Sequence, residues 1–263
     1  MFKEDYLQGK VALVTGGNRG IGRIIAINLT KAGATTIILG RDEYQNDLTL
    51  QELQQINTEC MAVKADITSG ESVKTALNTI REKLNHIDIL VNCAGESGPN
   101  KSIINLTEQE WEETLKSNLT GPFIITKEVV SDMIKNKEGH IFFISAIGAK
   151  SGMPNRSPYS SAKSGLIGLA RSLANELGAY NIKVNTIVPG TVEGDRINRI
   201  VEEQSKKNNI PFEKYKSLMA RNSSLKRFVD AENIAAMIVL LSGSNGSTIT
   251  GEDININAGA YFG

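Results

Sequence analysis

Tyr159 and Lys163 lie four residues apart in the segment Ser157 to Lys163, where Pro158 is typical of the first turn of a helix and Ser157 of its cap. That spacing places both side chains on one helix face. An ammonium group beside a phenol favours the phenolate, so we expect a lowered pKa for Tyr159. Such a tyrosine can donate a proton to a carbonyl oxygen or remove one from an alcohol. Because a Tyr and a Lys often share a helix face by coincidence, the pair needs support from elsewhere in the chain.

Polar or small residues end three of the apolar runs that could be strands. The run HIFFIS ends at Ser145, the run IDILVN ends in the tetrad Asn92-Cys93-Ala94-Gly95, and the run IKVNTIV leads to Pro189-Gly190-Thr191. Ligands of parallel sheets bind beyond the carboxyl ends of the strands. We therefore expect the Ser145 hydroxyl to lie beside Tyr159, where it could hold a substrate oxygen.

A glycine-rich loop, TGGNRGIG (15–22), stands between the first apolar run and a helical pattern that extends from about Ile21 to Ala32. Glycines permit the tight turn and the close approach to a pyrophosphate that a dinucleotide site needs, and the helix N-terminus favours phosphate. A plain tight turn is the simpler alternative. A nucleoside triphosphatase loop is disfavoured, because Arg23 and Ile24 stand where Lys and Ser or Thr are required.

Arg41 follows the second apolar run, TTIIL, at the point where a dinucleotide site distinguishes its two cofactors. An acidic residue there binds a ribose 2′-hydroxyl, whereas an arginine accommodates a 2′-phosphate. Arg41, with Arg19 beside it, favours NADP(H). In the alternative, Asp42 turns inward and selects NAD(H).

The bulk composition excludes several other classes of function. The net charge is +0 and only 5% of the residues are aromatic, which disfavours nucleic acid and anionic membranes as partners. The two cysteines, Cys60 and Cys93, have no metal-binding spacing and are expected to be small buried residues, so we expect no metal. No apolar run reaches membrane length and the first residues lack a signal core, so we expect a cytoplasmic protein.

Seven short apolar runs alternate with helical patterns along the chain. They are continuous rather than alternating in polarity, as in strands that helices cover on both faces. We therefore predict an α/β fold, a Rossmann-type doubly wound parallel sheet of about seven strands with helices on both faces, in a single domain over residues 1–263. The charged stretch 193–222 interrupts this rhythm and is predicted to be a helical insertion on the substrate side, a candidate lid. The strands are expected at VALVT (11–15), TTIIL (35–39), MAVKA near 63, IDILVN near 90, HIFFIS near 143, IKVNTIV near 185 and DININ near 255.

Taken together, these motifs resemble the short-chain dehydrogenase/reductase family in its single-domain branch, and the tail NAGAYFG resembles that of the 3-oxoacyl-carrier-protein reductases and related bacterial reductases. The matching pieces occur in family order and span nearly the whole chain: TGGNRGIG (15–22), Asp66-Ile67, NCAG (92–95), Asn118, Ser145, YSSAK (159–163) and PGT (189–191). The one departure is Cys93, where the family often has Asn. We expect the thiol to pack without affecting activity.

The resemblance implies an NADP(H)-dependent oxidoreductase that moves a hydride between the nicotinamide and a ketone or secondary alcohol, with a homotetramer as the usual assembly. It implies that Tyr159 is the acid/base, that Ser145 stabilises the substrate oxygen, and that Asn118 positions a water which relays protons to Lys163. The cofactor residues that it implies, to which the strand-tip argument adds Arg41, are Gly16, Asn18, Arg19, Gly20, Ile21, Arg41, Asp66, Ile67, Asn92, Ala94, Gly95, Tyr159, Lys163, Pro189, Gly190 and Thr191.

Four alternatives remain to be weighed. The chain could be a 3-oxoacyl-carrier-protein reductase proper, or a non-catalytic NADP(H)-binding regulator, although such regulators usually lack the Tyr or the Lys. An extended-branch epimerase or dehydratase would need a further C-terminal domain. A serine hydrolase is disfavoured, because no G-x-S-x-G elbow is present and His86 and His140 stand at strand starts as expected surface or capping residues.

The identity of the small-molecule carbonyl or alcohol substrate is not encoded in these motifs. We expect specificity to reside in three segments (96–100, 146–155 and 193–222). Arg156 and Arg196 could recognise an anionic substrate, but placement on the surface is an equal expectation for each.

Overall fold

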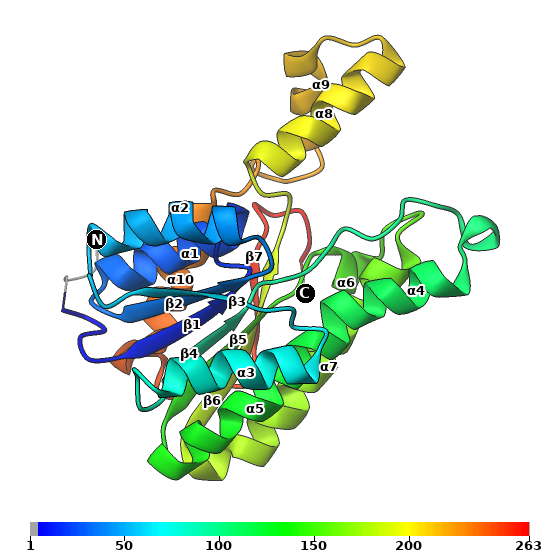
Figure 1. Cartoon of the computed structure of the whole chain (residues 1–263). Helices are drawn as coiled ribbons and strands as arrows, with labels where there is room; N and C mark the ends of the chain where they lie inside the picture. Colours follow the sequence, from blue (N-terminus) through cyan, green and yellow to red (C-terminus); the bar gives the residue numbers. More distant parts are fainter. Residues whose placement is uncertain (1–4, 263) are drawn as a thin grey trace.

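The computed structural model describes residues 5–262 and contains a seven-stranded, fully parallel sheet in the order β3-β2-β1-β4-β5-β6-β7 (Figure 1). The direction of winding reverses between β1 and β4, which opens a crevice at the carboxyl ends of those strands. The strands are β1 (Val11–Thr15), β2 (Thr35–Gly40), β3 (Met61–Lys64), β4 (Ile89–Asn92), β5 (Gly139–Ile144), β6 (Ile182–Pro189) and β7 (Asp253–Ile256).

Helices cover both faces of the sheet, so the core has two halves (Figure 1). In β1, Val11 and Leu13 face one half, whereas Ala12 and Val14 face the other. This explains why the strands read as continuous apolar runs: successive side chains point to opposite faces and both faces are buried. The first half packs against α3 (Gly70–Arg81), α5 (Gly121–Asn136) and α7 (Ser157–Leu177), and the second against α1 (Gly20–Lys31), α2 (Glu43–Gln54) and α10 (Ala231–Ser242).

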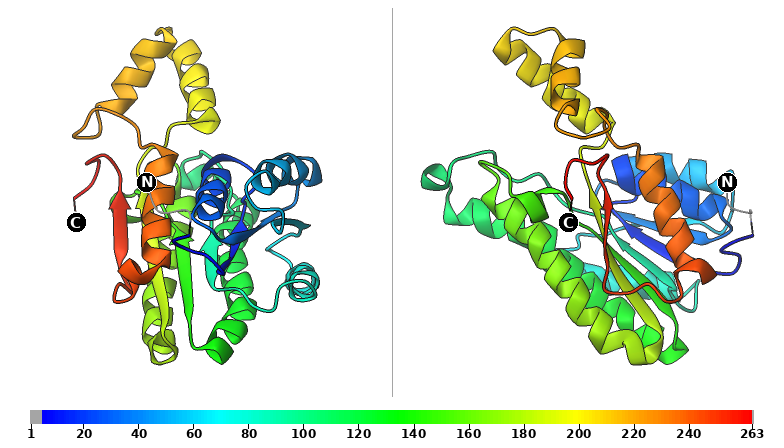
Figure 2. Two further views of the ribbon diagram at one scale, coloured as in Figure 1. Left: turned by 90° about the vertical axis from the view of Figure 1, so that its left-hand side faces the viewer. Right: turned by 180° about the vertical axis from the view of Figure 1, so that it is seen from behind.

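Five further helices lie near the carboxyl edge of the sheet or project from it (Figure 1). They are α4 (Glu108–Leu115), the π-helix η2 (Lys116–Thr120), the short helix α6 (Gly148–Ser151), and α8 (Asp195–Asn208) with α9 (Phe212–Ala220). The pair α8–α9 packs mainly against itself and stands away from the body in all three views (Figures 1 and 2). One segment of chain leads into α8 and another leads out of α9. An isolated parallel bridge between Val192 and Val229 joins these two segments.

The doubly wound sheet and all seven strand positions predicted from the sequence are confirmed, and the stretch 193–222 does form two helices between β6 and β7. One local prediction is wrong. Ser157 is the first residue of α7 rather than its cap, and Arg156 occupies the cap position without a capping side-chain hydrogen bond. Pro158 lies in the first turn, as expected.

Candidate active site

Three glycines of the loop after β1 meet three different requirements. Gly16 has a φ of +65°, and a Cβ there would lie 2.9 Å from the Cα of Ala94. A Cβ on Gly22 would lie 2.3 Å from the carbonyl oxygen of Gly16, so α1 can pack closely onto the loop only with glycine here. Gly20 has a φ of +54° but faces open space. The loop is therefore tight on its inner side and open on its outer side, as a phosphate cradle must be.

The start of α1 leaves its backbone donors available. The cap residue Arg19 is exposed and makes no capping side-chain hydrogen bond. The first N–H groups of a helix have no partner within the helix and carry partial positive charge, which favours an anion. Ile21 follows in the first turn and is half-buried.

Thr15, which the sequence analysis did not single out, fixes the glycine loop to the end of β4. Its hydroxyl accepts hydrogen bonds from the backbone N–H groups of Cys93 and Ala94, both at 3.1 Å. A hydroxyl that accepts two backbone bonds sets the separation of two neighbouring strand ends. The groove between Gly16 and Gly95 thus has a defined width.

Two predicted cofactor residues turn their side chains inward. The Asn18 amide donates to Asn46 of α2 at 2.8 Å, and the Asn92 amide donates to the Thr126 hydroxyl of α5 at 3.0 Å. Both asparagines are buried. Their amide nitrogens thus bond to α2 and α5, whereas the side-chain oxygen of Asn92 is buried without a partner among the described residues.

The tips of β2 and β3 bring one arginine and several carboxylates close together. Arg41 is exposed and forms an ion pair with Glu96, which is also exposed. Asp42 does not turn inward as the NAD(H) alternative required, because its carboxylate caps α2 by accepting from the N–H of Gln45. Burial alone would raise the pKa of Asp66, but hydrogen bonds from Thr68 and the nearby Arg41 lower it, so Asp66 is an ionised turn residue. Next to it, Ile67 is buried.

Ser145, at the end of β5, and Lys163, on α7, are brought into contact. The Ser145 hydroxyl donates to the carbonyl of Lys163 at 2.8 Å, and the Lys163 ammonium donates to the carbonyl of Ile144 at 2.8 Å. The ammonium lies 5.8 Å from the centre of the Tyr159 ring. Because Lys163 is only 5% exposed, burial lowers its pKa to about 8.

The prediction that Lys163 lowers the pKa of Tyr159 is wrong for this structure. Burial raises the pKa of Tyr159, and a hydrogen bond and positive charge from Arg196, with the charge of Arg156, only partly offset it. Desolvation disfavours the phenolate more than these cations favour it. Tyr159 is consequently a proton donor at neutral pH.

Asn118 lies in the middle of the π-helix η2, a type of irregularity that is frequent at functional sites. Its amide donates to the carbonyl of Thr114, but its side-chain oxygen is buried and has no hydrogen-bond partner among the described residues. A Cβ on Gly95 would lie 2.6 Å from that oxygen and 3.5 Å from the Lys163 nitrogen. The structure thus brings Asn118 and Lys163 together on either side of Gly95, with an acceptor left for a further donor.

The loop after β6 closes the other end of the crevice. The carbonyl of Pro189 accepts from the N–H of Ile147, and the carbonyl of Thr191 accepts from Val229. Gly190 packs so closely on Asn257 that a Cβ would lie 2.8 Å from its Cα. This contact fixes the residues 189–191 against the end of β7.

Two arginines reach the phenol region from different elements. Arg156, before α7, donates from Nη1 to the carbonyls of Ser97 and Gly98, both at 3.0 Å. Arg196, in the first turn of α8, carries a positive charge that opposes the rise in the pKa of the Tyr159 phenol. From the sequence, binding of an anionic substrate and placement on the surface were equal expectations for both arginines. Their contacts depend on how the loop 96–100 and the insertion fold back, which no local pattern encodes.

The histidines lie at the opposite end of the sheet, as expected, but His140 is not a surface residue. It is 5% exposed, and burial lowers its pKa to about 4. Cys60 is buried as predicted, whereas Cys93 is half-buried. Burial raises the pKa of the Cys93 thiol to about 11, which favours the thiol over the thiolate at neutral pH. Within residues 5–262, no His, Cys, Asp or Glu cluster could hold a metal ion.

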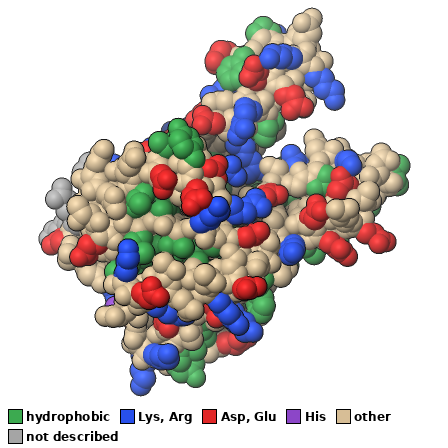
Figure 3. Space-filling view, in the orientation of Figure 1, with side chains coloured by type: hydrophobic (Ala, Val, Ile, Leu, Met, Phe, Trp, Pro, Cys, Tyr) green, Lys and Arg blue, Asp and Glu red, His purple; other side chains and the backbone are tan. Residues whose placement is uncertain are grey.

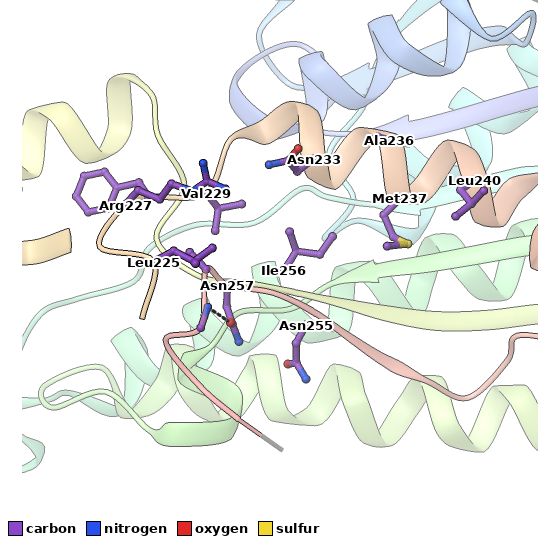
Figure 4. Close-up of a pocket in the computed structure, with 13 residues that line it drawn as sticks. Leu225, Arg227, Val229, Asn233, Ala236, Met237, Leu240, Asn255, Ile256 and Asn257 are labelled. Carbon is purple, nitrogen blue, oxygen red and sulfur yellow. Dashed lines mark hydrogen bonds between the residues drawn. The ribbon is translucent and has the colours of Figure 1, made fainter. Parts of the chain in front are cut away.

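A hollow of about 600 Å³ lies between α10, the residues 225–229 and the end of β7 (Figure 4). None of the predicted site residues lines it. Asn257, which lines the hollow, also packs against Gly190 of the loop after β6.

Comparisons with known proteins are consistent with this geometry. Residues 10–205 match the short chain dehydrogenase family model. A 3-oxoacyl-[acyl-carrier-protein] reductase of Aquifex aeolicus is 38% identical, with 98% of this chain and 100% of the relative covered. A crystal structure of an actinorhodin polyketide ketoreductase variant with NADPH superimposes with a TM-score of 0.90 at 30% identity over 99% of both chains. An NAD⁺-bound xylitol dehydrogenase also reaches 0.90, at 27% identity over 96% of this chain and 99% of the other.

Proposed function

The chain belongs to the short-chain dehydrogenase family, and on this premise we propose that it is an NADP(H)-dependent oxidoreductase acting on a ketone or secondary alcohol. The observation that carries the proposal is the convergence of Ser145, Tyr159 and Lys163 at the carboxyl edge of the sheet, beside the glycine loop. The NADPH-bound ketoreductase and the reductase relative support reduction of a carbonyl group as the reaction.

The residues of the crevice fit a dinucleotide. The open side of Gly20 and the uncapped start of α1 suit a pyrophosphate. Arg41 suits a 2′-phosphate, because its pair with Glu96 is exposed and such pairs are weak enough to exchange for a phosphate partner. The remaining cofactor residues would be Gly16, Asn18, Arg19, Ile21, Asp66, Ile67, Asn92, Ala94, Gly95, Tyr159, Lys163, Pro189, Gly190 and Thr191. A nicotinamide bound at the inner end would supply or accept the hydride.

The four catalytic residues that we propose have complementary roles. Tyr159, protonated at neutral pH, donates its proton to the carbonyl oxygen of the substrate. Ser145 holds that oxygen once its hydroxyl turns away from the Lys163 carbonyl. Lys163 stabilises the phenolate left after transfer and then gives it a proton, and the free side-chain oxygen of Asn118 holds a water that replaces this proton on Lys163.

The test is a panel of ketones followed by NADPH absorbance and repeated with NADH, on the wild type and on Arg41→Ala. We expect NADPH to be preferred and Arg41→Ala to lower kcat/KM for NADPH about 30-fold, with NADH changed less than about threefold. Lys64→Ala breaks a similarly exposed ion pair, with Glu43, and is the matched control. A strong preference for NADH would contradict the choice of cofactor.

The second candidate function is reduction of a 3-oxoacyl group on a carrier protein, which the 38% identity to such a reductase favours. A non-catalytic NADP(H)-binding regulator is the remaining alternative. Stable NADPH binding with no turnover of any carbonyl or alcohol would support the regulator and contradict both enzymatic functions.

We also propose a homotetramer in the cytoplasm. Large apolar side chains exposed on the described surface support association: Ile103, Ile104 and Phe123 are 69%, 87% and 47% exposed. Among the helices of residues 5–262, none combines the length and the apolar character needed to cross a membrane. Light scattering of the purified protein and fractionation of cells test the two parts of this proposal.

A further inference from the structure

Arg156 stands at the start of α7, the helix that carries Tyr159, and its side chain bonds to the loop that follows β4. It occupies the cap position of that helix. Its Nη1 donates to the carbonyls of Ser97 and Gly98, both at 3.0 Å. A guanidinium is charged and planar, so these bonds are stronger and more directional than bonds between neutral groups. The Arg156 side chain thus fixes the loop to the start of the helix.

The loop 95–101 depends on these contacts for its position. None of its residues is buried, and the surface beside it is hollowed between the α8–α9 pair and the part of the body that carries α4 and α6 (Figures 1 and 3). Within residues 5–262, its backbone forms one other hydrogen bond, from the N–H of Lys101 to the carbonyl of Asn155 at 3.0 Å. Its side chains form two ion pairs at the surface, and such pairs contribute little to stability. A loop with so few contacts is expected to open locally when they are removed.

The same loop packs against α4, which in turn holds Asn118. Gly98 has a φ of +65°, and a Cβ there would lie 2.9 Å from both Cγ2 and Oγ1 of Thr114. The carbonyl of Thr114 accepts from the side-chain amide of Asn118 at 3.0 Å. A continuous chain of contacts therefore leads from Arg156 through Gly98 and Thr114 to Asn118.

The proposed proton relay requires Asn118 in η2 and Lys163 in α7 at a fixed separation, because one water must bond to both. Gly95, at the beginning of the loop, lies between them: a Cβ there would lie 2.6 Å from the side-chain oxygen of Asn118 and 3.5 Å from the Lys163 nitrogen. Arg156 bonds to this loop from the start of the helix that also carries Lys163. Without its two bonds, the loop and Asn118 would be free to shift relative to Lys163.

We infer that Arg156 is a positioning residue of the proposed reduction. It holds the loop 95–101 on the start of α7 and thereby keeps Asn118 at the distance from Lys163 that the proton relay needs. This inference rests on the proposed function and adds a residue to its relay. It replaces both roles that the sequence left open for Arg156, anion binding and placement on the surface.

The main experiment is steady-state kinetics of Arg156→Met with NADPH and the best ketone of the panel. Methionine keeps an unbranched apolar stem but has no donor, so kcat should fall about 30-fold as Asn118 loses its position. The Kd for NADPH should stay within about threefold, because the Thr15 hydroxyl still holds the backbone of Cys93 and Ala94. Arg156→Lys, which keeps a charged donor for one carbonyl, should recover kcat to within about fivefold of the wild type.

Arg81→Met is the matched control. Arg81 joins α3 to α5, where it donates to the carbonyl of Glu128 at 3.0 Å and to the carboxylate of Asp132 at 2.9 Å. Its loss should lower stability but change kcat less than about twofold, because neither helix carries a residue of the relay. If Arg156→Met keeps the kcat of the wild type, or if both variants lower kcat equally, the inference is overturned.

Combination with Asn118→Ala tests the route of the effect. If Arg156 acts by positioning Asn118, Arg156→Met should lower kcat less than about threefold once the Asn118 side chain is absent. Effects that multiply in the double variant would overturn the inference. Arg156→Gln, which is neutral and shorter than arginine, serves in the same comparisons if the methionine variant does not fold.

Amide hydrogen exchange separates this inference from the proposed function. The N–H of Lys101 and those of η2 should exchange at least about tenfold faster in Arg156→Met than in the wild type, whereas those of α3 should not change. If no carbonyl compound is turned over but exchange still rises in these segments, the proposed function fails and the positioning by Arg156 stands. If exchange is unchanged in both segments, the inference is overturned whatever the activity.

Discussion

The two ends of the sheet carry charged groups in contrasting states. At the amino end, Asp88 accepts from the N–H of Val11 and pairs with Lys10 and His86, and Lys10 also pairs with Glu138. At the carboxyl end, the cations around Tyr159 have no acidic partner among the described residues. Both ends contain buried ionisable groups, so burial alone does not mark a site. The buried ammonium of Lys163, which has only the carbonyl of Ile144 as a hydrogen-bond partner among the described residues, contrasts with the paired carboxylate of Asp88.

The largest effect should come from removing the buried charge at the carboxyl end. Lys163→Met should lower kcat by about 10³-fold or more, because the phenolate that forms on Tyr159 loses its cation. The fold should survive, since a buried ammonium is costly and methionine fills a similar volume. Steady-state kinetics and circular dichroism check the two parts, and a variant that is unfolded would contradict the second.

The pH dependence of the free energy of unfolding should also reveal the buried charge of Lys163. The pKa of Lys163 is about 8 in the folded chain against 10.5 ordinarily, so between these values the unfolded chain holds a proton that the folded chain lacks. Stability therefore rises with pH in this window. We compare the free energies of unfolding of the wild type and of Lys163→Met. From pH 8 to 10, the value for the wild type minus that for the variant should increase by about 1 kcal/mol per pH unit. If urea unfolding shows the same pH dependence of the free energy of unfolding for both proteins across this range, the burial of the charge is contradicted.

A change at the amino end should affect stability and leave catalysis unchanged. Asp88→Ala leaves the buried N–H of Val11 without its acceptor and should lower the free energy of unfolding by about 2–3 kcal/mol. Asp88→Asn keeps an acceptor and should lose about half as much. Urea midpoints and kcat/KM test this contrast, and a large loss of kcat in folded Asp88→Asn would remove the distinction between the two ends.

The smallest effect concerns His140, which packs against Phe142 in β5. Its pKa is about 4, lowered mainly by burial and further by Lys183, so it is neutral in the folded chain while the unfolded chain binds a proton below pH 6.5. Stability is lost as the pH falls from 6.5 to 4. His140→Phe should reduce this loss by about 1 kcal/mol per pH unit, measured by urea unfolding at pH 6.5, 5.5 and 4.5. An unchanged acid sensitivity would show that other groups account for it.

The sequence predicted the fold well because its signals are local or periodic. Continuous apolar runs mark buried parallel strands, and the glycines of 16–22 and the polar strand ends mark one edge of the sheet. The prediction that the pKa of Tyr159 is lowered was wrong, because burial by distant segments raises it more than a cation on the same helix lowers it. The inward side chains of Asn18 and Asn92 also depend on tertiary packing. The spacing of residues along the sequence does not predict such contacts.

The most direct measurement is turnover by Tyr159→Phe with NADPH and the best substrate of the panel, alongside the Kd for NADPH. The account predicts that kcat falls about 10³-fold or more, since phenylalanine has no proton to transfer, while the Kd stays within about threefold because the glycine loop and Arg41 are untouched. Turnover close to that of the wild type with cofactor binding intact would contradict the account.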